Sequence, residues 1–222
     1  LVEVALIDLQ RWRGVASHFN RATPLDSWLY DVMGGLILAV TLVCLDLTVR
    51  LLRRPPAGMP ADMVLAARAG FVLLSVSCLL GIWASMHGDR RSQAGLAPEI
   101  LGAAGVVKFP HGVVIHAVQW LPALAWAAWR AGLAERSRLR LVATATLGSG
   151  LMLAYALAQT LLGLGRFDAP PALAVLLALA VACLGVPVVV TAAAWLWSRR
   201  QPPGWCDHRC WRNNQSSTAR SR

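Results

Sequence analysis

Residues 171–197 read PALAVLLALAVACLGVPVVVTAAAWLW and contain no charged side chain. A helix needs about 20 mostly apolar residues to cross the ~30 Å of hydrocarbon in a bilayer, so this stretch is long enough to span one. Residues 141–163 form a second uncharged, mostly apolar stretch. Because nothing in either stretch resists transfer into lipid, both are predicted to be transmembrane helices.

The composition of the whole chain agrees with this prediction. Of the 222 residues, 57% are apolar and only 14% are charged, whereas soluble domains carry about 25% charged residues. So high an apolar content excludes a disordered chain. Five cysteines are too few for a disulfide scaffold. The class that remains is an integral membrane protein.

Three further windows are long and apolar enough to span, although each carries ionisable side chains: 28–49, 63–86 and 110–129. We therefore predict an all-α fold, a polytopic transmembrane helical bundle with five full spans. Residues 1–10 are too short to span, and we interpret them as a partial helix, the end of a further, truncated N-terminal span. The alternative for this segment is a short surface helix.

The distribution of basic residues predicts how the chain is threaded. Fourteen of the 21 Lys and Arg residues lie in or beside 50–62, 130–140 and 199–222, and short loops rich in Lys and Arg stay in the cytoplasm. These segments are therefore predicted to lie on the cytoplasmic side of a bacterial cytoplasmic (inner) membrane. Residues 199–222 are predicted to form a basic, disordered cytoplasmic tail. The segments 11–27, 86–109 and 164–170 are predicted to lie outside.

The net charge of +10 would suit a nucleic-acid partner, but here the basic residues lie at helix ends, where they fix topology and meet anionic headgroups. We expect the lipid bilayer as a partner, with other membrane proteins as further candidates, and no nucleic acid.

Ionisable residues within the predicted spans suggest a function because they are costly in lipid. Asp46 and Arg68 lie at equal sequence distances from Ala57 in the turn between two spans. Antiparallel helices would hold them at matched depth, where carboxylate and guanidinium can form an intramembrane ion pair. Such a pair either holds the two helices together or takes part in solute or proton transport. Alternatively, no pair forms and the Arg68 side chain extends to the lipid headgroups by itself.

Four histidines fall in the predicted outer half of the protein: His18, His87, His111 and His116. Imidazole ligates transition metals and haem iron, so histidines from different segments could form a joint haem, metal or ligand site. His111 and His116 are five positions apart, however, which places their side chains about 140° apart around a helix. The alternative is that each makes a separate hydrogen bond at the interface.

The predicted outer loops hold further polar candidates for binding, namely Asn20, Asp26 and Asp89. Thr23 and Asp26 also precede or begin a predicted span, where such side chains cap the free amides of a helix. Capping would explain them without a ligand.

Three motifs carry a family resemblance: RGxxSHFNxxTPxD at 13–26, HGD at 87–89 and FPHGxxxHAxQxLP at 109–122. Together they resemble a family of uncharacterised bacterial multi-pass integral membrane proteins, over the chain up to about residue 125. The resemblance implies a membrane location and a role for the motifs, but no reaction.

Three functional hypotheses follow. The first, which we favour, is a non-catalytic membrane module with a ligand- or partner-binding outer face, for which we assign no catalytic residue. The second is a membrane redox protein that binds haem or a transition metal through the outer histidines. The third is a transporter for protons or small solutes.

Overall fold

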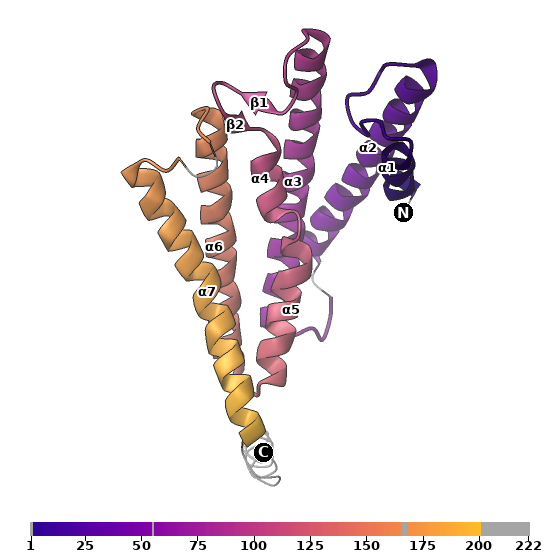
Figure 1. Cartoon of the computed structure of the whole chain (residues 1–222). Helices are drawn as coiled ribbons and strands as arrows, with labels where there is room; N and C mark the ends of the chain where they lie inside the picture. Colours follow the sequence, from indigo (N-terminus) through magenta and orange to yellow (C-terminus); the bar gives the residue numbers. More distant parts are fainter. Residues whose placement is uncertain (1, 55, 166–167, 201–222) are drawn as a thin grey trace, which may run out of the picture.

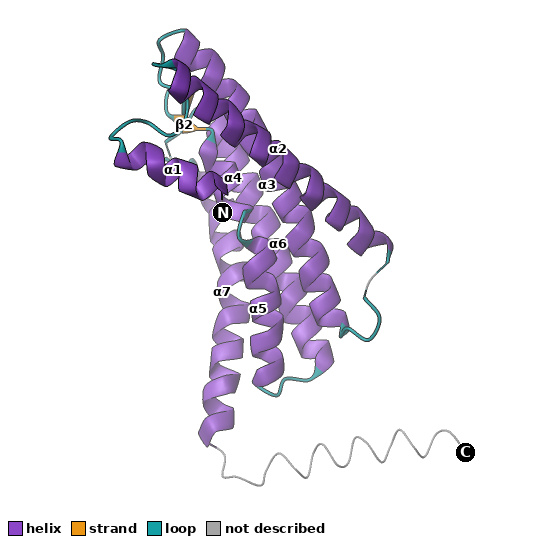
Figure 2. Ribbon diagram, turned by 90° about the vertical axis from the view of Figure 1, so that its right-hand side faces the viewer, coloured by secondary structure: helices purple, strands orange, loops and turns teal. Residues whose placement is uncertain are grey.

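The structure, a computed structural model, describes residues 2–54, 56–165 and 168–200. Helices dominate it, and a two-stranded antiparallel hairpin lies at one end (Figure 1 and Figure 2). In chain order the elements are α1 (Val2–Trp12), α2 (Pro24–Arg53), α3 (Ala61–Gln93), β1 (Ile100–Leu101), β2 (Gly105–Val106), α4 (Lys108–Val114), α5 (Ala117–Arg130), α6 (Glu135–Leu161) and α7 (Pro171–Arg200).

Five helical segments of the described chain are long and apolar enough to cross a membrane: α2, α3, the consecutive pair α4 and α5, α6, and α7. The predicted all-α polytopic bundle is therefore confirmed. The helices extend beyond the predicted windows at one end or both, although α6 ends at Leu161, two residues before its window. The longest, α3, has 33 residues and is about 50 Å long at 1.5 Å per residue. Apart from residues 199 and 200, which end α7, the predicted tail lies outside the described residues.

The third predicted span, 110–129, is not one continuous helix. It is divided between α4, which ends at Val114, and α5, which begins at Ala117. At the division, the backbone amides of Gln119 and Trp120 both donate to the carbonyl of His116, at 3.0 and 3.1 Å. The backbone hydrogen bonds of a new helix thus begin at the carbonyl of His116.

The bundle is organised around α3, which contacts α2, α4, α5 and α6. α7 packs mainly against α6, and α2 packs mainly against α3, so α2 and α7 lie on opposite sides of the bundle (Figure 1). The core lies between α3, α5 and α6, where Ala66, Leu121, Ala125, Val142 and Ala145 are fully buried.

Small residues set the spacing between the helices. A Cβ placed on Gly70 of α3 would lie 2.7 Å from the Cα of Val118 in α5, and one on Gly148 of α6 would lie 2.9 Å from the Cβ of Cys183 in α7. In lipid, helices associate through van der Waals packing, and small residues let their backbones approach closely. The two glycines therefore allow close packing of α3 on α5 and of α6 on α7.

One buried ion pair joins the starts of α3 and α6. Arg138 donates to both carboxylate oxygens of Asp62, from Nε at 2.8 Å and from Nη2 at 3.2 Å, and its Nη1 donates to the carbonyl of Leu133 at 2.9 Å. Both side chains are largely buried, at 11% and 2% exposed.

Candidate functional site

The first motif folds into a loop fixed at its two ends by Asp26. Thr23 is the N-cap of α2: its hydroxyl accepts from the amide of Asp26 at 3.1 Å and donates to the Asp26 carboxylate at 2.7 Å. The other carboxylate oxygen accepts from Arg13 at 2.7 Å and from Gln10 of α1 at 3.2 Å. Both oxygens of this buried carboxylate are thus occupied in joining α1, the loop and α2, and the predicted cap at Thr23 is confirmed.

Phe19, at the tip of the loop, joins the first motif to the second. It adopts a left-handed backbone conformation, with φ 58°, which is uncommon for a residue other than glycine. Its ring packs on Gly88 near the end of α3 so closely that a Cβ there would lie 2.3 Å from the ring. Asn20 stabilises the turn by accepting from the amide of Ala22 at 3.1 Å.

Tyr30 of α2 lies beside this contact, with its ring 5.9 Å from that of Phe19. Its hydroxyl lies 3.2 Å from the hydroxyl of Ser85 and also interacts with Asp89. The guanidinium of Arg21 lies 5.0 Å from the centre of the Tyr30 ring and pairs with Asp31 at 2.7 Å. The hydrogen bond to Asp31 raises the pKa of Arg21 above its ordinary value.

The hairpin is held against the end of α3 by His87. The ring Nε2 of His87 lies 2.9 Å from the carbonyl of Ile100 in β1; because a carbonyl only accepts, Nε2 carries the proton. On the other side of the hairpin, Lys108 forms an ion pair with Glu99. The Lys108 ammonium also lies 5.8 Å from the centre of the Phe19 ring. The loop, the end of α3 and the hairpin therefore form one unit.

His18 lies on the surface of this unit, with Nδ1 2.9 Å from the hydroxyl of Ser17. Partial desolvation and, next, the nearby charge of Lys108 lower the pKa of His18, and Glu99 acts in the opposite direction. We call the surface formed by His18, Arg21, Asp31, Glu99 and Lys108 the polar rim.

The other two predicted histidines lie apart from the rim. His111 packs against Gly81 between α4 and α3, and its Nδ1 donates to the carbonyl of Ser77 at 2.8 Å. The Ser77 hydroxyl in turn donates to the carbonyl of His111 at 2.9 Å. His116, exposed at the division between α4 and α5, lies 2.9 Å from the side-chain oxygen of Gln119.

Each of the four histidines therefore makes its own hydrogen bond. Within residues 2–54, 56–165 and 168–200, no group of three or more His, Cys, Asp or Glu side chains is placed to hold a metal ion. This arrangement agrees with the interpretation of separate hydrogen bonds and leaves a site with one or two histidine ligands as the remaining form of the cofactor hypothesis.

The predicted ion pair between Asp46 and Arg68 is not formed. Asp46 instead pairs with Arg50, one turn further along α2, at 2.7 Å. Arg68 donates to the carbonyls of Leu51 and Leu52, at 3.1 and 3.0 Å. The reason is that the last carbonyls of a helix have no partner within it; Arg68 satisfies those of α2, while Asp46 has a closer basic neighbour.

Sequence reasoning missed the buried ion pair between Asp62 and Arg138. From the sequence, Arg138 is one of the basic residues that predict topology, and Asp62 precedes the predicted window 63–86. A usable signal was present: one acidic and one basic residue stand in the first turns of two helices that begin at the same predicted membrane face.

Comparison of the chain with protein-family models, with curated proteins and with solved structures gave no match. The fold and its apolar helices define a membrane protein with several spans.

Proposed function

We propose that this protein is a non-catalytic module of the bacterial cytoplasmic membrane, with its C-terminus in the cytoplasm and an outer face that binds a partner membrane protein or a ligand. The proposed binding surface is the polar rim. The observation that carries the proposal is the seating of Phe19 on Gly88, because it ties the first two motifs into one preformed surface.

The rim is suited to recognition because its charges are accessible. Its ion pairs, between Arg21 and Asp31 and between Lys108 and Glu99, are each more than 40% exposed on both sides. Such exposed pairs contribute only about 0–1 kcal/mol to stability. They are thus free to exchange for charges on a partner, which gives specificity and faster association.

The proposed threading is supported by the basic residues at the opposite end of the bundle, where α2 ends and α6 begins. In a variant whose five native cysteines are replaced by Ser, a single cysteine at exposed Ser92 should react in intact cells with a membrane-impermeant maleimide, whereas one at exposed Ser137 should react only after permeabilisation. The reverse pattern would overturn the proposed orientation.

Site-specific photocrosslinking tests the binding surface. A photoreactive residue at His18 of the full chain in native membranes should give one protein adduct of defined mass, and the same residue at Val189, exposed on α7, should give none. The adduct should decline when Arg21 and Lys108 are replaced by Gln. No adduct at position 18, or equal adducts at both positions, would contradict a protein partner at the polar rim.

A second candidate, a haem or transition-metal protein, is favoured by the orientation of two histidines. His87 and His111 each direct one ring nitrogen at a backbone carbonyl, so in the neutral ring the other nitrogen keeps its lone pair. Metal-ligating histidines are commonly oriented in this way. His18 and His116 are the other candidate ligands.

Absorption spectroscopy and metal analysis of the purified protein distinguish the two candidates. A Soret band, or stoichiometric metal, that is lost in His111→Ala or His87→Ala would support the cofactor. Colourless, metal-free protein purified from haem- and metal-replete cells would refute it. The ion pair suggested for transport is not formed, because Asp46 and Arg68 bond elsewhere; transport itself stays a prediction.

A further inference from the structure

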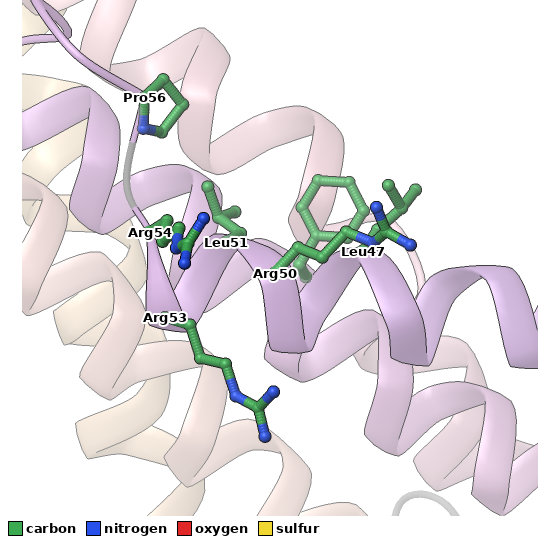
Figure 3. Close-up of a pocket in the computed structure, with 7 residues that line it drawn as sticks. Leu47, Arg50, Leu51, Arg53, Arg54 and Pro56 are labelled. Carbon is green, nitrogen blue, oxygen red and sulfur yellow. The ribbon is translucent and has the colours of Figure 1, made fainter.

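A groove of about 600 Å³ lies between the last turns of α2 and the facing side of α3. Figure 3 shows Arg50 alongside Leu47, and Arg54 beside Leu51. The groove lies at the opposite end of α2 from the polar rim, where the helix ends at Arg53. Its lining combines apolar side chains with three arginines: Leu47, Leu51, Pro56 and Phe71, with Arg50, Arg53 and Arg54.

The charge of the groove is not balanced within the described chain. Arg50 is paired with Asp46 at 2.7 Å. Neither Arg53 nor Arg54 forms an ion pair with any acidic residue among those that the structure describes. Two positive charges therefore stand beside an apolar surface at the end of a membrane-spanning helix.

The walls of the groove are fixed by hydrogen bonds between α2 and α3. Thr48 lies 2.8 Å from the hydroxyl of Ser75, and it lies 3.2 Å from the carbonyl of Phe71. Nearer the helix end, Arg68 holds the carbonyls of Leu51 and Leu52. Because Arg68 already satisfies these carbonyls, Arg53 and Arg54 are not needed to cap them.

We infer that this groove binds an acidic phospholipid, with the phosphate on Arg53 and Arg54 and an acyl chain along Leu47, Leu51 and Phe71. Arginine matches the geometry of phosphate oxygens, and basic pockets between spanning helices bind anionic headgroups. The apolar wall beside the charges distinguishes a lipid from a free anion, because inorganic phosphate gains nothing from Leu47 or Phe71.

Native mass spectrometry of the full chain in detergent tests the inference. Phosphatidylglycerol should form a one-to-one adduct at concentrations where phosphatidylcholine forms none. Since each basic residue near an anionic surface contributes on the order of fivefold in affinity, Arg53→Gln with Arg54→Gln should weaken the adduct roughly 25-fold. The matched control is Arg136→Gln with Arg140→Gln, which removes two exposed charges from the start of α6 and should leave the adduct unchanged.

A second variant separates the groove from general electrostatic attraction. Phe71→Ser keeps every charge and should still weaken the adduct severalfold; circular dichroism and the melting temperature verify that the variant is folded. The inference is overturned if phosphatidylcholine binds equally well, if the control pair loses the adduct as fully as the groove pair, or if millimolar inorganic phosphate displaces the lipid. An adduct insensitive to Phe71→Ser in folded protein overturns it as well.

Discussion

The guanidinium of Arg138 in α6 donates two hydrogen bonds to the carboxylate of Asp62 in α3, and both side chains are largely buried. Desolvating two charges is costly, so a buried pair adds little over a well-packed apolar pair. Losing one partner, in contrast, leaves the other charge buried and uncompensated. The pair therefore makes the α3–α6 contact sensitive to single substitutions.

Arg138→Gln should destabilise the protein by about 3–5 kcal/mol, the range for breaking a buried ion pair from one side. Unfolding by SDS titration in mixed micelles measures this free energy. Arg136→Gln, at an exposed position two residues away, is the matched control and should change stability by less than about 0.5 kcal/mol.

The double variant Asp62→Leu with Arg138→Leu should recover part of the stability lost in Arg138→Gln, because it leaves no unpaired charge. If Arg138→Gln were as stable as its control, the pair would contribute nothing to the α3–α6 contact.

Close helix packing gives a second prediction. Gly70→Ala places a Cβ 2.7 Å from the backbone of α5, and a backbone atom cannot move aside as a side chain does. We expect a loss of about 1–3 kcal/mol, typical of overpacking. Gly34→Ala, where a Cβ meets nothing within 4 Å, should be neutral or stabilising through helix propensity. The same SDS titration compares the two, and equal stabilities would show that α3 and α5 are less closely packed.

The fold was predictable because spanning helices are determined by local composition. The uncharged stretch at 171–197 falls within α7, and the one at 141–163 coincides with α6 except for its last two residues. The cap at Thr23 depends on residues three positions apart. The division at His116 left no comparable signal, since the window carries no Asp, Glu, Lys or Arg and is as a whole apolar enough to span.

The candidate site was less predictable because its contacts join residues far apart in the chain. The docking of Phe19 on Gly88 requires the loop to cross to the end of α3, and no local pattern encodes that. For Asp46 the error was the reverse, because a distant partner was predicted where a local one exists. Arg68 lies at a similar depth in the next helix, but Arg50 is one helical turn away and pairs with Asp46 without any tertiary contact.

The α2–α3 contact gives a third prediction. Cys44 of α2 and Cys78 of α3 lie near each other across it, and both cysteines are free. Oxidation with copper phenanthroline in membranes should therefore join them, so that the fragments produced by trypsin cleavage at Arg53 stay linked without reductant. The link should disappear in Cys44→Ser and Cys78→Ser and persist in Cys183→Ser. Fragments that separate in oxidised wild-type protein would contradict the placement of α2 on α3.

The polar rim gives a prediction about how the stability of the folded protein depends on pH. Because partial desolvation and Lys108 lower the pKa of His18 in the folded state, the folded protein takes up this proton less readily than the unfolded chain. Stability associated with His18 is therefore present above its ordinary pKa of 6.5 and declines as pH falls below that value. His18→Gln should lessen this acid-side decline, measured as melting temperature against pH.

Lys108→Gln isolates the electrostatic cause. It removes a nearby positive charge and leaves the Glu99 carboxylate unpaired, and both changes favour the protonated imidazole. The pKa of His18 should therefore rise toward its ordinary value, as followed by NMR titration of histidine-labelled protein in detergent micelles, with the resonance assigned from His18→Gln. Lys108→Arg keeps the charge and should keep the pKa low. An unchanged or lower pKa in Lys108→Gln would mean that Lys108 does not act on His18, and that the loop and the start of α4 do not form one continuous charged surface.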